Sequence, residues 1–269
     1  MPRPVTVTYK VATSAGAVAE AAAALFTKAA VDAVAARGRT KIAISGGSTP
    51  KAMFALLADA TKPFLAEVPW DKLDLYWVDE RCVPPDDKDS NYRMTKEQML
   101  SKVPLAEDRI HRMEGELEPE VAASRYESVL RNTFKLEGAE TPTFDLVLLG
   151  MGDDGHTASL FPHTDGLNEI GRLVIANHVL QKETWRVTLT WPVINQGRQV
   201  AFLIEGAAKT DVLHRVLQGP YDPETLPSQL IRPASGKLLF LLDEVAAAKL
   251  PEPAGHESGL KVGILELDR

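Results

Sequence analysis

The chain contains a single cysteine, Cys82, among its 269 residues. One thiol cannot form an intramolecular disulfide or a cysteine-based zinc site, so a reducing compartment is the natural setting. The sequence also lacks any stretch close to the roughly 20 apolar residues that span a membrane, and its amino terminus lacks the long apolar core of a secretory signal. We therefore expect a cytoplasmic protein that does not insert into membranes.

Positive charge is in deficit as well. The 37 Asp and Glu residues outnumber the 30 Lys and Arg residues, and the formal net charge is -7. Cationic side chains that neutralise phosphates drive nucleic-acid binding, so this balance argues against a nucleic-acid partner. Any anionic ligand must be met by a few local basic residues. Hydrophobic residues make up 45% of the chain, which suits an ordinary globular protein with a large core.

Strand-length apolar runs alternate with helical stretches along most of the chain. A long alanine-rich helix is predicted from Ser14, a suitable N-cap, to Arg37, with Gly38 as its stop. The apolar, β-rich runs predict strands at residues 42–44, 73–78, 146–149, 187–190, 200–204 and 238–242. Helix-forming residues predict further helices at 49–58, 92–101, 121–135, 207–217 and 243–250.

This alternation predicts an α/β fold, with a doubly wound, mainly parallel sheet flanked by helices and a Rossmann-like topology. Ligands of such folds bind at the carboxyl ends of the strands. Residues 1–250 are predicted to form one such domain, since no repeat or obvious linker interrupts them. Residues 251–269 end in an apolar run, 260–267, that could be a further strand. We treat 251–269 as a C-terminal tail without an assigned role.

The most informative segment runs from Gly150 to Ser159 and reads GMGDDGHTAS after an apolar run. Its letters satisfy G-x-G-x-x-G, a pattern whose glycines let a dinucleotide pyrophosphate approach a helix N-terminus. Two features argue against a dinucleotide. The loop carries Asp153 and Asp154, which would face the phosphates, and the position about 20 residues on, where an acid should bind the ribose, offers only Asn177.

A histidine directly after the last glycine of this loop favours an acid/base site instead. His156 stands two residues from Asp154, and a nearby carboxylate can orient an imidazole. With an unperturbed pKa of about 6.5, an imidazole is a suitable base at neutral pH. A purely structural histidine is the alternative.

A second loop, at residues 45–50, reads SGGSTP and follows the first predicted short strand. Gly46 and Gly47 permit unusual backbone angles, and the N–H groups and dipole of the following helix favour a negative charge. Ser48 and Thr49 add hydroxyl donors. The pattern G-x-x-x-x-G-K-[ST] is absent, so the loop is not a nucleotide P-loop. It predicts an oxyanion or phosphate site, with a simple helix cap as the alternative.

Charged side chains mark the ends of other predicted elements. Asp79 and Arg81 follow the second short strand, where α/β folds bind ligands, and an ion pair between them is the alternative. Arg186 begins another strand. Lys209 lies near the start of a helix, where the helix dipole disfavours a cation, so an anion is expected nearby; a solvated lysine is the alternative.

No other residue type suggests chemistry. Cys82 has no histidine partner marked by the sequence, so we do not expect it to be a nucleophile. The remaining histidines show no metal-ligand spacing, and we predict structural roles for them and no metal site. They are His111, His163, His178, His214 and His256.

Taken in order, five motifs resemble the 6-phosphogluconolactonase family, over residues from about 40 to 245. They are SGGSTP at 45–50, WVDER at 77–81 with SNY at 90–92, GMGDDGHTASLFP at 150–162, RVTLT at 186–190 and EGAAK at 205–209. The related glucosamine-6-phosphate deaminases share the scaffold and an Asp-Gly-His loop, and they are the enzymatic alternative. The deaminase motif resembles Asp-Glu-Tyr at the position where this chain has Asp79-Glu80-Arg81. After the histidine the deaminases continue into an Asn-Glu-Pro segment, which this chain lacks. Both differences favour the lactonase.

The resemblance implies hydrolysis of 6-phospho-D-glucono-1,5-lactone to 6-phosphogluconate in the oxidative pentose phosphate pathway, without metal or organic cofactor. His156 would take a proton from the attacking water, and Asp154 would orient the imidazole. Arg81 would stabilise the oxyanion or bind the phosphate. The other predicted substrate contacts are Asp79 and, for the 6-phosphate, Gly46, Gly47, Ser48, Thr49, Arg186 and Lys209.

Some questions stay open at this level. A sugar-phosphate-binding module without catalytic activity is an alternative of a different class. The acidic run at 86–89 lies beside the proposed site, and its effect on substrate preference is open. The sequence also leaves the oligomeric state undetermined.

Overall fold

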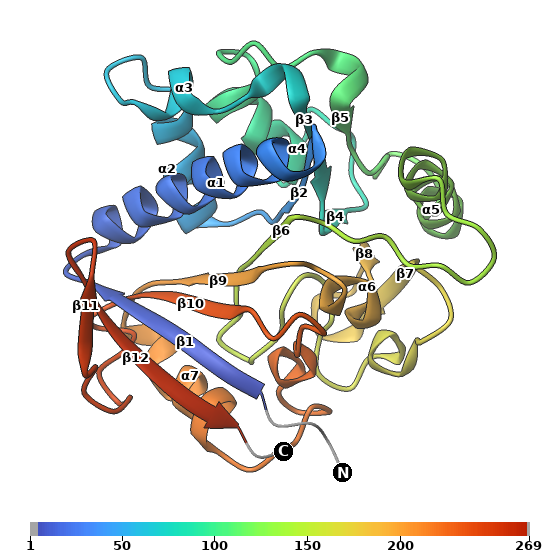
Figure 1. Ribbon diagram of the computed structural model, residues 1–269. Helices are drawn as coiled ribbons and strands as arrows, with labels where there is room; N and C mark the ends of the chain where they lie inside the picture. The colour runs from blue at the N-terminus through green and yellow to red at the C-terminus, as the bar shows by residue number, and fades with distance from the viewer. Residues whose placement is uncertain (1–4, 268–269) are drawn as a thin grey trace.

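The computed structural model describes residues 5–267 (Figure 1). Residues 1–4 and 268–269, at the ends of the predicted domain and tail, lie outside this range. The main sheet is built, in chain order, from β1 (Val5–Ala12), β2 (Thr40–Ile44), β3 (Leu73–Trp77), β5 (Ile110–His111), β6 (Leu146–Leu149), β9 (Val200–Ile204), β10 (Leu238–Asp243), β11 (Gly255–Glu257) and β12 (Leu260–Leu267). A smaller sheet contains β4 (Asp79–Arg81), β7 (Val174–Val179) and β8 (Thr184–Leu189).

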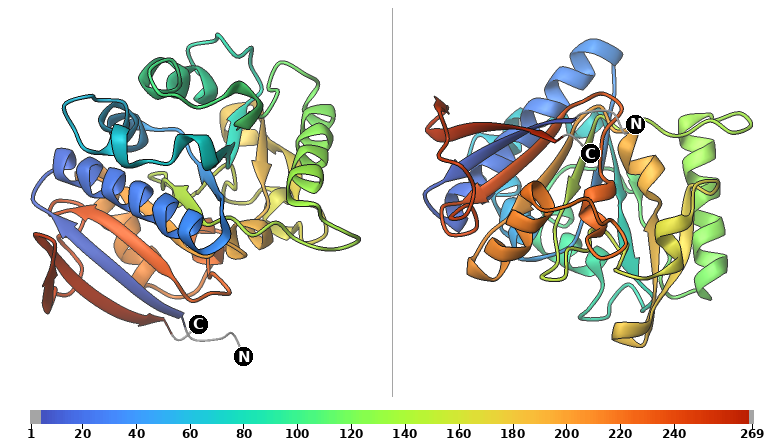
Figure 2. Two further views of the ribbon diagram at one scale, coloured as in Figure 1. Left: turned by 45° about the horizontal axis from the view of Figure 1, so that its top comes forward. Right: turned by 90° about the horizontal axis from the view of Figure 1, so that it is seen from below.

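The helices fill the connections between these strands. They are α1 (Ala15–Arg37), α2 (Ser48–Leu57), α3 (Phe64–Glu67), α4 (Asn91–Thr95), α5 (Pro119–Phe134), α6 (Trp191–Asn195) and α7 (Thr210–Gln218). Figure 2 shows α1 and α7 on opposite faces of the main sheet. No helix within residues 5–267 combines the length and the apolar character that a membrane crossing requires.

The main sheet has the strand order β11-β12-β1-β10-β9-β6-β2-β3-β5. Every neighbouring pair from β1 to β5 runs parallel, and only the pairs of β12 with β1 and of β11 with β12 are antiparallel. The predicted fold class, a mainly parallel α/β sheet with flanking helices, is confirmed.

The order in which successive strands are added to the sheet reverses between β2 and β6, which are parallel neighbours. From β2 the chain continues to β3 on one side, whereas the strands beyond β6, namely β9 and β10, lie on the other. The loops after β2 and β6 therefore diverge and leave a crevice at the carboxyl edge, where doubly wound folds bind ligands.

Helix α1 begins and ends where its sequence predicts. The Ser14 hydroxyl accepts a hydrogen bond from the Ala17 N–H at 3.2 Å, and Gly38, with φ of 77°, donates its N–H to the Val34 carbonyl. The buried stripe of the helix includes Val18 and Phe26, which pack on the sheet. The cap residues and the small alanines thus confirm the predicted helix.

Strand β1 is absent from the sequence-based strands, although its buried positions alternate with more exposed ones. It pairs with β10 on one side and with β12 on the other, so the segment after residue 250 completes the sheet and the predicted boundary there is not a boundary of the sheet. Gly263 of β12 is needed for this packing, because a Cβ there would lie 2.0 Å from the Tyr9 ring. The Tyr9 hydroxyl also donates to the Pro251 carbonyl at 2.8 Å.

Two predicted helices differ from the structure. The helix expected at 92–101 is α4 followed by a π-helical turn at residues 96–100. The prediction of a helix at 243–250 is wrong, since only turns follow β10. The Asp243 carboxylate accepts hydrogen bonds from the N–H groups of Ala246 and Gly206, and such side-chain bonds compete with a regular helix. Pro251 also prevents a helix from continuing beyond residue 250.

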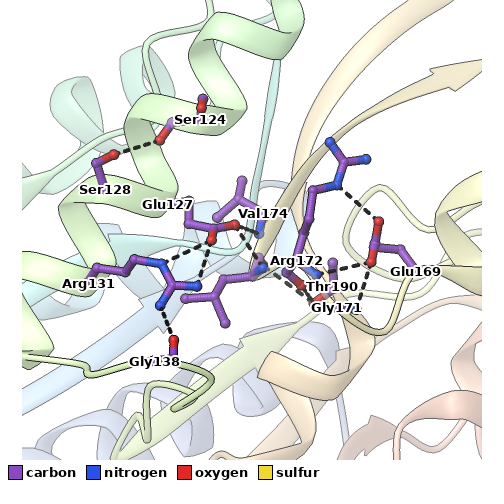
Figure 3. Close-up of polar contacts among 11 residues, drawn as sticks. Ser124, Glu127, Ser128, Arg131, Gly138, Glu169, Gly171, Arg172, Val174 and Thr190 are labelled. Carbon is purple, nitrogen blue, oxygen red and sulfur yellow. Dashed lines mark hydrogen bonds and ion pairs between the residues drawn. The ribbon is translucent and has the colours of Figure 1, made fainter.

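The strand predicted at 187–190 belongs to the smaller sheet, as β8, and pairs antiparallel with β4 and β7. Helix α5 anchors this sheet. Figure 3 shows Glu127 of α5 between Arg131 of its own helix and the backbone at Val174. One carboxylate oxygen of Glu127 also accepts the Leu173 N–H at 2.9 Å, which fixes the start of β7. A strand that turns away from the main sheet through such contacts cannot be read from local sequence.

Candidate active site

A cavity of about 440 Å³ opens at the carboxyl edge of the main sheet. The loops after β2, β6 and β9 line it, together with β4 and the start of β8. All the predicted site residues line this cavity except Asp154, which lies against His156. The fold therefore gathers residues that are up to about 160 positions apart in sequence, from Gly46 to Lys209.

The imidazole of His156 is held by two neighbours. Its Nδ1 atom lies 2.6 Å from Oδ1 of Asp154, and the His156 N–H donates to the same oxygen at 3.1 Å. The ring stacks on Phe161 with a centroid separation of 3.9 Å and an interplanar angle of 18°. Since Asp154 occupies Nδ1, the Nε2 atom remains for proton transfer.

Burial raises the pKa of the Asp154 carboxyl, but the hydrogen bond and the charge of the His156 imidazole outweigh it, and the pKa falls to about 2. The carboxylate is therefore ionised at neutral pH. An ionised acceptor at Nδ1 fixes the tautomer that carries its proton there, and it stabilises the imidazolium that forms when Nε2 takes up a proton.

The glycines of this loop make room for the His–Asp pair. A Cβ at Gly152 would lie 2.0 Å from Nδ1 of His156 and 2.6 Å from Oδ1 of Asp154. Gly155 has a φ of 80°, and a Cβ there would meet Leu226 at 2.8 Å. The Gly152 N–H donates to the His156 carbonyl at 2.9 Å, which closes the turn. The glycine pattern thus has a local steric role that needs no nucleotide.

Two arginines lie side by side on the smaller sheet. Arg81 of β4 and Arg186 of β8 are directly opposite each other in the strand register. The Arg81 Nη1 donates to the Asp89 carbonyl at 2.6 Å, and the Arg186 Nη1 donates to the hydroxyl of Thr184 and the carbonyl of Trp185. Neither guanidinium forms an ion pair with a carboxylate of residues 5–267, so the alternative ion pair between Asp79 and Arg81 is not found.

Burial lowers the pKa of Arg186, and the positive charge of Arg81 adds to this effect, while Asp79 opposes it. Two adjacent cations without a carboxylate partner raise the local potential and favour an anionic ligand between them. The acidic segment at 86–89 contributes the Asp89 carbonyl to this region, and none of its carboxylates lines the cavity.

Asp79 and Glu80 are both buried but have different surroundings. Asp79 lines the cavity, and its Oδ2 accepts the hydroxyl of Ser159 at 2.7 Å. Glu80 is 2% exposed and accepts the N–H groups of Arg81, Asn91 and Tyr92. Burial raises the pKa of Glu80, and these backbone bonds oppose that rise. Glu80 therefore fixes the start of α4, whereas Asp79 can accept a ligand hydroxyl.

The loop at 45–50 leads into α2. Gly47 has a φ of 122°, and no side chain caps the first turn of the helix, so its N–H groups are available to an anion. A Cβ at Gly46 would lie 1.9 Å from Oδ1 of Asn91, which packs under the loop. The Ser48 hydroxyl donates to Oε1 of Glu205 at 3.2 Å, and Thr49 is buried.

Lys209 lines the cavity next to the loop that follows β6, and its ammonium forms an ion pair with Asp153 of that loop. The position of Lys209 near a helix start predicts an anion close by. In this structure that anion is the carboxylate of Asp153. Asp153 is 70% exposed, so this contact is accessible to competing ligands. A phosphate that binds Lys209 must replace Asp153.

Two cavity residues escaped the sequence analysis. Lys182 lies on the short helical turn Leu180–Lys182 between β7 and β8. It lines the cavity, and its ammonium forms no hydrogen bond or ion pair with the rest of residues 5–267. No motif marks it, because its position depends on how the β7–β8 hairpin folds back. Glu205 also lines the cavity, and its place as the first residue of the EGAAK motif is the signal that could have identified it.

Two further observations concern chemistry that the sequence did not favour. Burial raises the pKa of the Cys82 thiol to about 11, so it is protonated at neutral pH and is a poor nucleophile. Within residues 5–267 no three His, Cys, Asp or Glu side chains are grouped so that they could hold a metal ion.

Comparisons with known proteins agree with these features. A family model described as glucosamine-6-phosphate isomerases/6-phosphogluconolactonase matches residues 13–240. A 6-phosphogluconolactonase of Synechocystis sp. is 42% identical over 219 residues, which cover 81% of this chain and 88% of the relative. A human 6-phosphogluconolactonase is 38% identical over 226 residues, 84% of this chain and 86% of the relative. The structure of 6-phosphogluconolactonase from Trypanosoma cruzi has a TM-score of 0.78 and 31% identity, and the match covers 90% of this chain and 96% of that one.

Proposed function

The chain belongs to the glucosamine-6-phosphate isomerase/6-phosphogluconolactonase family, and we propose that it hydrolyses 6-phospho-D-glucono-1,5-lactone to 6-phosphogluconate. The observation that carries the proposal is the pairing of His156 with Asp154 in a cavity that also holds the unpaired guanidinium groups of Arg81 and Arg186. Relatives named as lactonases support the substrate. The reaction belongs to the oxidative pentose phosphate pathway, and we place it in the cytoplasm.

The first step is the attack of water on the lactone carbonyl. His156 Nε2 accepts a proton from the water as its oxygen bonds to C1, and Asp154 stabilises the imidazolium through Nδ1. The negative charge of the tetrahedral intermediate then develops on the former carbonyl oxygen. General acid/base action of this kind contributes about 10²–10⁴-fold to the rate.

The second step breaks the bond between C1 and the ring oxygen. The imidazolium of His156 returns its proton to the departing ring oxygen, which becomes a hydroxyl group, and C1 becomes a carboxyl group. One water is consumed and the histidine returns to its neutral form, so no cofactor enters the balance. The cations of the cavity stabilise the oxyanion between the two steps.

The substrate carries a second anionic centre in its phosphate. We assign the phosphate to the loop residues Gly46 to Thr49, with Arg186 and Lys209, and we add Lys182 because it lines the same cavity without a partner. Each charge-assisted bond contributes about 1.5–3 kcal/mol. Arg81 is assigned to the oxyanion, with the phosphate as the alternative. Asp79 accepts a sugar hydroxyl.

The experiment that tests this function compares two substrates with the wild-type protein. Freshly prepared 6-phosphogluconolactone should be hydrolysed well above its spontaneous rate, as followed by proton release. Glucosamine 6-phosphate should release no ammonia. Ammonia release would identify a deaminase, and saturable binding of 6-phosphogluconate without either reaction would identify a non-catalytic sugar-phosphate-binding module; each result would overturn the proposal.

A further inference from the structure

A second cavity, of about 570 Å³, lies at the opposite edge of the main sheet from the proposed active site. The amino ends of β2, β3 and β5 and the carboxyl end of α5 line it. We call it the basic pocket, and its charged and ionisable lining residues are Arg39, Lys41, Asp74, Asp108, Arg109, His111 and Lys135. None of these residues contributes to the reaction proposed above.

The charges of the basic pocket do not balance. Two arginines and two lysines face two carboxylates, in a chain whose formal net charge is -7. Asp74 is the only buried carboxylate of the pocket, and three basic groups share it. Its oxygens lie 3.4 Å from Nε of Arg39, 3.8 Å from Nη1 of Arg109 and 3.4 Å from Nε2 of His111. These distances exceed the roughly 2.7–2.9 Å of strong charge-assisted bonds, so Asp74 neutralises none of them fully.

Two cations of the pocket have hydrogen-bonding or ion-pairing capacity that residues 5–267 leave without a partner. The Arg109 Nη1 atom is buried and has no hydrogen-bond partner. The ammonium of Lys41 donates to the Thr133 carbonyl at 2.5 Å and lies 3.8 Å from the centre of the Phe134 ring, but it forms no ion pair with residues 5–267. Burial lowers the pKa of Lys41. The carboxylates of Asp74 and Asp145 oppose this effect, and the positive charges of Arg39 and Lys135 add to it. Lys41 and Arg109 are partly buried, and neighbouring cations that repel one another are stabilised by an added anion.

Rigid aromatic groups form part of the surroundings. His111 stacks on Tyr76 with a centroid separation of 4.5 Å, and the Tyr76 ring contacts Phe134 at 5.5 Å. Lys41 and His111 therefore lie on strands β2 and β5, and Arg39, Arg109 and Lys135 lie next to the ends of β2, β5 and α5. The volume falls within the range of small-molecule sites, about 300–1,000 Å³.

We propose that the basic pocket binds a phosphate group, either as inorganic phosphate or as part of a small phosphorylated molecule. The guanidinium groups of Arg39 and Arg109 can each bind two phosphate oxygens, and the ammonium groups of Lys41 and Lys135 add point charges. This site is separate from the proposed active site, because the two cavities lie at opposite ends of the strands β2 and β3.

Histidine imidazole signals in an NMR spectrum can report on the two cavities separately, because His111 lines the basic pocket and His156 lines the proposed active site. Titration of the full chain with inorganic phosphate, at constant ionic strength, should shift the His111 signal along its own saturation curve. Glucose 6-phosphate should also shift it, and glucose should not. Tighter binding of glucose 6-phosphate indicates a phosphorylated molecule as the ligand, and equal or weaker binding indicates phosphate itself.

Variants test whether the basic residues cause the response. Replacing two exposed cations, Arg39→Gln with Lys135→Gln, should weaken phosphate binding at His111 about tenfold, the equivalent of about 1.4 kcal/mol, and leave the His156 response unchanged. The matched control, Lys28→Gln with Lys249→Gln, removes the same charge from other surfaces and should change neither response. A His111 signal that stays in place throughout the titration, or that weakens equally in the control, would overturn the proposal.

Discussion

The loops after β2 and after β6 lie at the same edge of the sheet and are both rich in glycine, but their glycines have different tasks. In the β6 loop, Gly152 makes room for His156 and Asp154 of the same loop, the pair proposed to be catalytic. In the β2 loop, Gly46 makes room for Asn91 from α4, and Gly47 turns the chain into an uncapped helix start. Similar composition therefore serves a side-chain site in one loop and a backbone site in the other.

The comparison implies a division of labour. The β6 loop presents a proton acceptor, and the β2 loop presents N–H groups at a helix start, which favour an anion. Changes in the β6 loop should lower kcat, and changes in the β2 loop should raise KM. Variants in the two loops can therefore break or sharpen the comparison.

The largest expected effect follows from the change His156→Ala. It removes the base, so kcat for 6-phosphogluconolactone should fall by about 10²–10⁴-fold, whereas the affinity for 6-phosphogluconate measured by calorimetry should change little. The control variant His256→Ala alters an exposed imidazole on β11 and should retain full activity. A His156→Ala protein with wild-type kcat would show that another group is the base.

Alanine at the two glycines separates the loops. Gly152→Ala places a methyl group against His156 Nδ1 and displaces the imidazole. We expect kcat to fall by about 10²-fold, the lower end of the effect of losing a general base. Gly46→Ala displaces the buried Asn91, so it should lower the free energy of unfolding by about 1–3 kcal/mol and raise KM.

Gly150→Ala is the matched control for these variants, because a Cβ at Gly150 meets no atom within 4 Å. Its kcat and its urea midpoint should stay close to those of the wild type. If Gly46→Ala lowered only kcat and Gly152→Ala raised only KM, the roles of the two loops would have to be exchanged.

A smaller effect is expected at Lys209. Lys209→Ala removes one phosphate contact, so KM should rise about tenfold or more while kcat changes little. Asp153→Asn should change KM in the opposite direction and lower it, because it removes the carboxylate that the phosphate must replace at Lys209. Steady-state kinetics of both variants measure these changes in KM and kcat, with Lys249→Ala as the control. An unchanged KM in Lys209→Ala would remove Lys209 from the phosphate site.

The smallest effect concerns stability at low pH. The folded-state pKa of Asp154, about 2, lies below its usual value of about 3.9, so the ionised carboxylate is favoured by folding. This contribution is present above about pH 4 and is lost as the pH falls toward 2. The difference in unfolding free energy between wild type and Asp154→Asn should therefore be constant near neutral pH and shrink between about pH 4 and 2. A difference that grows in this interval would contradict the assignment.

Local signals explain what the sequence predicts well. Helix α1 has its N-cap and its stop within one continuous segment, and each glycine-rich loop follows a short apolar strand directly. The doubly wound topology then brings the carboxyl ends of the parallel strands to one edge. For these reasons the fold class could be predicted, as could the nearness of the glycine-rich loops and the charged residues that meet in the cavity.

Long-range contacts account for what the sequence does not reveal. Strand β1 is defined by its partners β10 and β12, and β8 leaves the main sheet to pair with β4 and β7. The place of Lys182 and the ion pair between Lys209 and Asp153 depend on how separate segments fold together. No periodicity or motif within a single segment contains that information.

The most direct test of the central claim is a crystal structure with bound 6-phosphogluconate. The account predicts that the carboxylate derived from the lactone lies within hydrogen-bond distance of His156 Nε2, and that the phosphate lies at the start of α2 with Lys209 released from Asp153. It would also show which anionic group Arg81 contacts. A ligand bound in the reverse orientation, with its phosphate at His156 and its carboxylate at the β2 loop, would contradict the division of labour between the two loops.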